Sequence, residues 1–141
     1  CMLHLPNMRK EEKHAREEMM DILDLVGLAD VAEERAGSLP YGKQKNLEIA
    51  RAVATQPKLL LLDEPASGLN TQELNELSSR VLKIREHGIS IILIEHKMDV
   101  VMAISEKIMV LNFGKRIAFG TPEEISTNPT VIEAYLGKED E

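Results

Sequence analysis

Apolar residues in the first third of the chain recur at helical spacing. Between residues 9 and 26 they return every three or four positions, with Arg, Lys and Glu between them, which predicts an amphipathic helix. The pattern predicts two more helices, a short one over residues 30–36 and one over residues 42–55. Gly37 favours an end of the first of these two helices, and Pro57 an end of the second. We therefore expect the front of the chain to be entirely helical.

From residue 58 onward, apolar runs alternate with amphipathic segments. Residues 58–62 and 89–94 are short and continuously apolar, which is typical of strands that are buried in a parallel sheet. A helix between them is predicted to follow an Asn70 cap and to end near Glu86, with Glu73 at the capping-box position. This order of strand, helix and strand predicts an α/β layer architecture with parallel strands.

The last third predicts shorter elements. Phe113-Gly114 separates two apolar runs and is a hairpin signal. The expected elements are a helix over 97–104, strands over 107–112 and 115–119, a helix capped by Thr121, and a helix that starts at Asn128-Pro129 and ends near Gly137.

Composition and charge limit the possible functions. The chain has 141 residues, 43% of them hydrophobic, which suits one domain with a core. Its formal net charge of −7 argues against a nucleic-acid-binding surface, which would normally carry a basic excess. No apolar run approaches the ~20 residues that span a bilayer. The one cysteine, Cys1, leaves no disulfide within the chain, and a start at Cys1 is typical of an internal piece of a longer protein.

Two adjacent carboxylates, Asp63 and Glu64, follow the first apolar strand. In α/β sheets, ligands bind beyond the carboxyl ends of the strands. An Asp at such a position commonly supports a hydrated Mg²⁺ in phosphoryl-transfer sites, and a neighbouring Glu can polarise an attacking water. The alternative is a pair of solvated acids that open a loop.

Two further segments carry candidate chemistry. Glu95-His96 follows the second strand, which would place an imidazole at the same edge of the sheet if the strands are neighbours. Residues 39–44 precede a helix whose N-terminus could bind phosphate, and Lys43 would reinforce this. Taken alone, His96 could also be a surface or capping residue, and residues 39–44 a plain helix start.

Residues 37–44 nearly match the phosphate-binding pattern G-x-x-x-x-G-K-[ST]. We reject this match for three reasons. Gln44 replaces the hydroxyl residue that would ligate Mg²⁺, a polar segment rather than a buried strand precedes the loop, and Pro40 removes a backbone N–H from a loop that works by donating them. We therefore expect that this chain lacks a phosphate cradle, known as Walker A.

Four ordered motifs resemble the ATPase subunits of ABC transporters. LPYGKQKNLEIARAVA is similar to the signature segment of that family, LLLLDEP to its Walker B strand, SGLN to its D-loop and IEHKMD to its switch-histidine segment. The resemblance runs from about residue 8 to residue 137. The tail, with VMAISEKIMVLNFGKRIAFGTPEEI and VIEAYLG, is most similar to ATPases of branched-chain amino acid importers.

The resemblance implies a role for each matching residue. Asp63 would support Mg²⁺ through water, Glu64 would be the general base, and His96 would contact the γ-phosphate of ATP. Residues 67–70, with Ser67 and Gly68, would cross to an opposing subunit. Tyr41, Gly42 and Lys43 would cap the γ-phosphate of ATP held by that subunit. The signature segment departs from the usual LSGGQ at Pro40 and Lys43, which puts the phosphate contact itself in doubt.

The resemblance also implies a fold and a function. It implies a partial P-loop NTPase core of the ABC type with parallel strands, preceded by an all-helical subdomain. Residues 1–56 would form that helical subdomain, and residues 57–141 the C-terminal half of the ATPase core. The full-length subunit would couple ATP hydrolysis to solute import, with branched-chain amino acids as substrates. Its partners would be a second ATPase subunit and transmembrane permease subunits, at the cytoplasmic face of the cell membrane.

Without a phosphate cradle, the isolated chain is expected to be inactive and to associate with itself through uncovered apolar surfaces. Two other functions stay open. One is a non-catalytic module that docks on a permease or a partner ATPase. The other is a soluble ABC ATPase that acts on ribosomes or DNA, against which the acidic charge and the importer-like tail argue.

Overall fold

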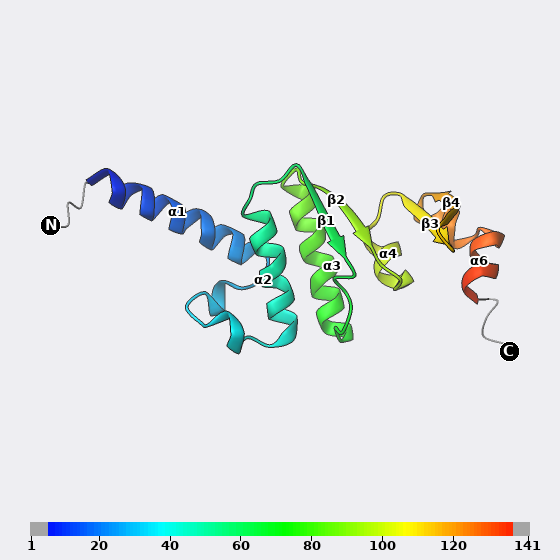
Figure 1. Ribbon diagram of the computed structural model, residues 1–141, viewed down its shortest axis with the longest axis horizontal. Helices are drawn as coiled ribbons and strands as arrows, with labels where there is room; N and C mark the ends of the chain where they lie inside the picture. Colours follow the sequence, from blue (N-terminus) through cyan, green and yellow to red (C-terminus); the bar gives the residue numbers. More distant parts are fainter. Residues whose placement is uncertain (1–5, 137–141) are drawn as a thin grey trace. The chain divides into compact units, whose positions relative to one another are not determined.

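A computed structural model describes residues 6–136 of the chain (Figure 1). The chain forms two compact units, Cys1–Ile94 and Glu95–Glu141. The two units meet between residues 94 and 95, whereas the sequence suggests a boundary between residues 56 and 57. The helical subdomain over residues 1–56 stays a prediction. Cys1, the one cysteine, and Gly137, the expected end of the last helix, lie outside the described residues.

Helices make up the front of the first unit, as the apolar spacing predicts. The two α-helices are α1 (Pro6–Leu25) and α2 (Tyr41–Val53). The helix expected over residues 30–36 is wrong, because the structure has two single 3-10 turns instead, η1 (Ala29–Val31) and η2 (Ala36–Ser38). The backbone N–H groups of Val31, Ala32 and Glu34 bond carbonyls three positions back rather than four, which closes separate turns instead of a continuous α-helix.

Two parallel strands follow α2 in the first unit. Strand β1 (Leu59–Asp63) pairs with β2 (Ser90–Ile94) in parallel, in a register that sets Asp63 opposite Ile94. Helix α3 (Thr71–Glu86) connects them and runs alongside the pair (Figure 1). The predicted strand–helix–strand unit is therefore confirmed, with bounds shifted by at most one residue.

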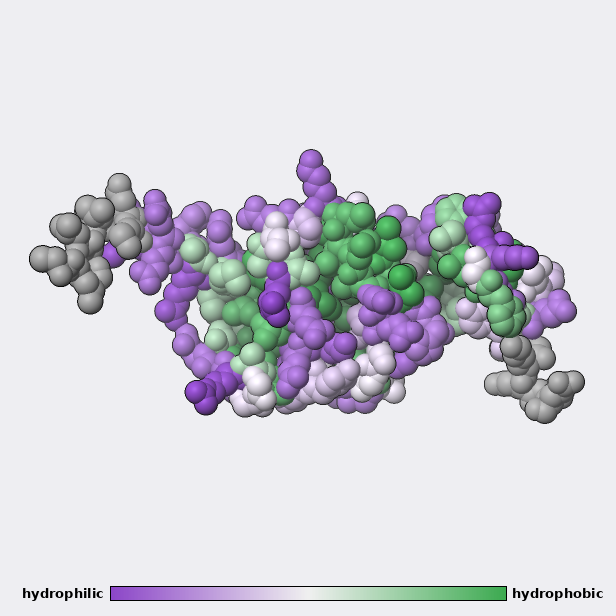
Figure 2. Space-filling view, viewed as in Figure 1, coloured by the Kyte–Doolittle hydropathy of each residue, from purple (hydrophilic) through white to green (hydrophobic). Residues whose placement is uncertain are grey.

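The two faces of this strand pair differ sharply. On one face Leu60 and Leu62 are buried, at 4% and 8% exposed. On the other face four apolar side chains are 49–67% exposed, namely Leu59, Leu61, Ile92 and Ile94. Figure 2 shows apolar side chains gathered over these strands. The expectation that both strands are buried on both sides is thus wrong for the described residues. Within residues 6–136, other elements pack on one face of the strand pair only.

Helix α3 starts as its sequence predicts. The Asn70 side chain accepts a hydrogen bond from the Glu73 N–H at 3.0 Å, and the Asn70 N–H donates to Glu73 Oε2 at 2.9 Å. This reciprocal capping box satisfies two backbone N–H donors at the start of the helix. It fixes the point at which the loop after β1 becomes α3.

The second unit is built around an antiparallel hairpin. It contains five elements, α4 (Met98–Ile104), β3 (Ile108–Asn112), β4 (Lys115–Gly120), α5 (Pro122–Ser126) and α6 (Pro129–Leu136). Phe113 and Gly114 both have positive φ, of 46° and 74°, which suits the predicted two-residue hairpin turn. The small core of this unit consists of Ile108, Val110, Ile125 and Val131.

Among the described residues, no helix is both long enough and apolar enough to cross a membrane.

Candidate functional site

The two predicted acids lie together at the carboxyl end of β1. Asp63 is the last residue of the strand, and Glu64 follows it directly. Both residues are exposed. The Glu64 N–H donates to the Ile94 carbonyl at 2.9 Å, which extends the pairing of β1 with β2 by one hydrogen bond. The strand pair therefore holds both carboxylates at its open end, where the sequence predicts a ligand.

Glu64 has an unusual backbone conformation. Its φ is +45°, in the left-handed region that costs a residue with a Cβ about 1–2 kcal/mol. Such strain is held only where surrounding structure enforces it, and it is concentrated at functional sites. Here the hydrogen bond to Ile94 and the tight turn that follows enforce it. The sequence gives no signal of this strain, because nothing in the letter E indicates a positive φ.

A tight turn leads from Glu64 back to α3. The Ser67 N–H donates to the Glu64 carbonyl at 3.1 Å, and Gly68 has a φ of +76°. Ala66 and Leu69 are 0% and 9% exposed, and they anchor the turn on the core. Ser67 and Gly68 are thus presented near the surface by a loop whose apolar residues are fixed.

The start of α2 lies against this turn. An added Cβ on Gly68 would come within 3.0 Å of Tyr41 Cε1, so the tyrosine ring lies directly over the glycine. The ammonium group of Lys45 lies 5.8 Å from the centre of the same ring. Gly42 is buried next to Glu73, and a Cβ there would meet Glu73 Oε1 at 2.5 Å. The structure therefore brings together two predicted segments, residues 41–43 and residues 67–68.

Lys43 is engaged by a residue that the sequence interpretation missed. Its Nζ donates to Asp30 Oδ2 at 2.6 Å, and this hydrogen bond holds the pKa of Asp30 below its usual value. The two residues are 13 positions apart, Asp30 in η1 and Lys43 in α2, so no local pattern signals the pair. In this structure the Lys43 ammonium is directed to Asp30, and its predicted contact with phosphate stays a prediction.

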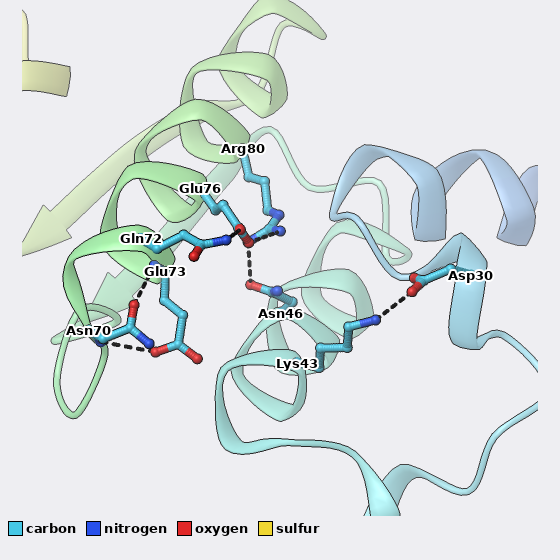
Figure 3. A network of polar contacts seen from close by, with 8 residues as sticks. All are labelled: Asp30, Lys43, Asn46, Asn70, Gln72, Glu73, Glu76 and Arg80. Carbon is cyan, nitrogen blue, oxygen red and sulfur yellow. Dashed lines mark hydrogen bonds and ion pairs between the residues drawn. The ribbon is translucent and has the colours of Figure 1, made fainter.

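A second polar network joins α2 to α3 (Figure 3). Arg80 donates to Glu76 Oε2 at 2.8 Å and to Asn46 Oδ1 at 3.3 Å, and Gln72 donates to Glu76 Oε1 at 3.2 Å. The hydrogen bonds from Arg80 and then from Gln72 lower the pKa of Glu76. These residues border an open cavity of about 290 Å³. A polar Asn46 on the apolar stripe of Ile49, Ala50 and Val53 was the sequence signal for such a partner.

His96 lies in the second unit, two residues after β2 ends. Its imidazole is exposed, and its Nδ1 is 4.0 Å from Glu95 Oε2. The His96 N–H donates to the same carboxylate oxygen at 3.2 Å. The predicted contact of His96 with the γ-phosphate stays a prediction, as does its place at the sheet edge that carries Asp63 and Glu64, because His96 belongs to the other unit.

The acidic strand end fits the way in which proteins hold Mg²⁺. Within residues 6–136, no group of three His, Cys, Asp or Glu side chains could hold a metal ion by itself. Mg²⁺ usually keeps several waters and takes one or two carboxylates together with substrate phosphates. An exposed strand-end Asp63 is suited to such a hydrated ion when a nucleotide supplies the phosphate oxygens.

Solved structures define the class of protein. A structure described as the ADP conformation of MJ1267, an ATP-binding cassette of an ABC transporter, superposes with a TM-score of 0.79 at 30% identity, covering 89% of this chain and 51% of that one. A nucleotide-free ATP-binding cassette from an ABC transporter gives a TM-score of 0.77 at 29% identity, covering 89% and 51%. The fold is thus that of a partial ATP-binding cassette.

Sequence comparison agrees. The "ABC transporter" family model matches residues 2–67, and the model "Branched-chain amino acid ATP-binding cassette transporter" matches residues 115–141. The high-affinity branched-chain amino acid transport ATP-binding protein BraF of Pseudomonas aeruginosa is 48% identical, covering 94% of this chain and 52% of BraF. LivG of Escherichia coli K12, described in the same words, is 46% identical, covering 97% and 54%.

The chain belongs to the ABC transporter ATPase family. It spans about half the length of the curated relatives it matches, 52–54% of BraF and LivG. The family and the partial P-loop NTPase fold that the sequence motifs imply are therefore confirmed.

Proposed function

We propose that this chain forms the signature segment and the acidic strand end of an ATPase subunit that powers the import of branched-chain amino acids. BraF and LivG, which are 46–48% identical, support the substrate class, as does the match of residues 115–141 to a branched-chain model. The observation that carries the proposal is the pair Asp63 and Glu64 at the open end of β1, with Glu64 held at a φ of +45°.

Each acid has a separate task in this proposal. Asp63 holds Mg²⁺ through water, and the bound ion neutralises charge on the phosphates of ATP. Glu64 lies one residue further along the chain and accepts the proton of the attacking water. The fixed backbone of Glu64 supports this assignment, because a general base must be held within hydrogen-bond reach of the proton that it removes.

The remaining site residues act on the nucleotide from other segments. Tyr41, Gly42 and Lys43 cap the γ-phosphate of ATP on an opposing subunit, and His96 contacts the γ-phosphate. The turn with Ser67 and Gly68 reaches toward that subunit. The contact of Tyr41 with Gly68 supports a joint action of the two segments, since neither can move without disturbing the other.

The proposed assembly contains a second ATPase subunit and transmembrane permease subunits. In it the chain lies at the cytoplasmic face of the cell membrane as a peripheral component. We further propose that the isolated chain does not turn over ATP, for lack of a Walker A loop. The element order supports this proposal, since η2 and the start of α2 lie within residues 36–44 and no strand precedes them within residues 6–35.

Calorimetric titration of the chain of residues 1–141 with Mg-ATP tests whether the isolated chain binds and hydrolyses ATP. Micromolar binding accompanied by turnover would contradict the proposed inactivity. A chain that binds a permease or a partner ATPase but never contributes to hydrolysis would support the alternative, a non-catalytic docking module.

The decisive test is Glu64→Gln in the full-length subunit assembled with its partners. Loss of a general base typically lowers turnover by about 10²–10⁴-fold. We expect such a loss of ATP hydrolysis while ATP binding is retained, because glutamine keeps the size of the side chain but cannot accept the proton. Glu86→Gln, at the exposed end of α3, is the matched control and should leave turnover unchanged. Normal hydrolysis in Glu64→Gln would remove Glu64 as the base.

A further inference from the structure

Arg80 lies where three segments of the first unit meet. Its side chain is only 16% exposed, although it carries a charge. Besides its hydrogen bonds to Glu76 on α3 and Asn46 on α2, it lies against Gly27, just after the end of α1. An added Cβ on Gly27 would come within 2.9 Å of Arg80 Nη2. One guanidinium group thus lies against all three segments, and Figure 3 shows its hydrogen bonds to Glu76 and Asn46.

The partner on α2 explains why an arginine is suited to this position. Asn46 is 6% exposed, and a buried amide oxygen requires a donor. The planar guanidinium carries N–H donors on three nitrogens in a fixed geometry, so it can donate to Asn46 with Nη1 and to Glu76 with Nη2 at the same time. A lysine has a single ammonium group at the end of a flexible chain and matches this geometry less well.

The hydrogen bond between α2 and α3 lies close to the proposed signature and turn residues. Along the helix axes, Asn46 is about 7 Å from Tyr41, and Arg80 is about 13 Å from the start of α3. At those helix starts the Tyr41 ring meets Gly68. Helix α2 therefore meets α3 at Asn46 and at Gly42, which lies against Glu73, and it meets the turn before α3 at Tyr41. Fixing the hydrogen bond at Asn46 restricts the angle between the two helices and so the position of Tyr41 on the turn.

We propose that Arg80 is a positioning residue that fixes α2 on α3 and thereby holds Tyr41 against the turn at Gly68. Its relevance to ATP hydrolysis rests on the function proposed above. The geometric statement does not, and it can be tested without nucleotide. The simpler possibility is that Arg80 forms only a local pair with Glu76 within α3, which would leave Tyr41 unaffected by its removal.

Fluorine NMR of the protein labelled with 3-fluorotyrosine distinguishes the two. The chain has two tyrosines, Tyr41 and Tyr135, and Tyr135 lies in the other unit and serves as an internal reference. The Tyr41 resonance is assigned by its loss in Tyr41→Phe. In Arg80→Gln we expect this resonance to shift and broaden, while that of Tyr135 does not move. Lys83→Gln removes an exposed positive charge from the same helix and should change neither resonance.

Two further variants keep the test decisive if Arg80→Gln folds poorly. Asn46→Ala removes the acceptor on α2 but leaves the pair of Arg80 with Glu76, so it should shift Tyr41 in the same way. Arg80→Lys should restore the wild-type position only in part. An unshifted Tyr41 resonance in Arg80→Gln or in Asn46→Ala would overturn the proposal. If the Tyr41 shift occurs but Glu64→Gln hydrolyses ATP normally, the proposed function fails and the positioning role stands.

Discussion

The ring of Tyr41 lies over Gly68, 27 positions later in the chain, so closely that an added Cβ would come within 3.0 Å of Cε1. This contact joins the segment that resembles the ABC signature to the turn that follows the acidic strand end. Gly68 makes it possible in two ways, through its missing side chain and through its φ of +76°.

We therefore expect Gly68→Ala to lower the free energy of unfolding by about 1–2 kcal/mol, from the left-handed backbone alone. Displacement of the Tyr41 ring would add to this loss. Urea unfolding monitored by circular dichroism measures it. Gly37→Ala is the control, since a Cβ at Gly37 meets nothing within 4 Å, and its effect should stay within about 0.5 kcal/mol. Equal losses in both variants would contradict the importance of the contact.

Glu76 should make stability depend on pH. Hydrogen bonds from Arg80 and Gln72 lower its pKa in the folded state, so its contribution is present above its pKa in the unfolded chain. That contribution is lost as the pH falls through the lowered pKa of the folded state. The difference in urea midpoint between wild type and Glu76→Gln should thus shrink from pH 7 to pH 3.

The expected effect at Glu76 is small, because its side chain is 45% exposed and salt screens the pair with Arg80. Glu86→Gln, at the end of the same helix, controls for the general loss of one negative charge. A midpoint difference for Glu76→Gln that is constant with pH would show that the pKa of Glu76 does not change on folding.

Asp63→Asn should raise the Mg²⁺ concentration at which the full-length subunit reaches half of its maximal ATP hydrolysis. The amide keeps the shape of the side chain but loses the charge that attracts a hydrated cation. A Mg²⁺ titration of turnover measures the change, and Asp24→Asn near the end of α1 should leave the curve in place. An unchanged Mg²⁺ requirement in Asp63→Asn would rule out Asp63 as the ion support.

The exposed face of β1 and β2 predicts self-association of the chain of residues 1–141. Leu61 is 67% exposed at the middle of this face. Contiguous apolar surface of this kind favours association, so Leu61→Lys should lower the association measured by sedimentation velocity without lowering stability. Met19→Lys replaces an exposed apolar residue on α1 and is the control. Equal effects of both variants would show that this sheet face is not involved.

Much of the fold could be predicted because its signals are local. The capping boxes of α3 and α5, the apolar runs of β1 and β2, and the turn at Phe113-Gly114 all depend on neighbours in sequence. The failure at residues 30–36 has a physical reason as well, since the backbone there closes hydrogen bonds three positions back and forms separate 3-10 turns, a choice that the apolar pattern does not show. The exposed face of β1 could not be derived from LLLL, because four leucines carry no period of two.

The candidate site was predicted unevenly for the same reason. Asp63 and Glu64 are recognised by their place after an apolar strand, which is a local pattern. Three contacts are tertiary, with 13 to 34 positions between partners: Lys43 with Asp30, Tyr41 with Gly68, and Arg80 with Asn46. The sequence singled out Lys43, Tyr41 and Gly68 but not their contacts, and it gave no role to Asp30, Asn46 or Arg80.

The left-handed backbone of Glu64 has a consequence for attempts to engineer this protein. Glycine or asparagine would adopt the same φ of +45° with less strain than glutamate. A screen that selects only for resistance to heat or urea should therefore enrich Glu64→Gly and Glu64→Asn, and discard the carboxylate. With Glu64 as the proposed general base, the residue that is most stable at position 64 differs from the one that hydrolysis requires, so a selection scheme that omits ATP turnover would favour the fold over the proposed chemistry.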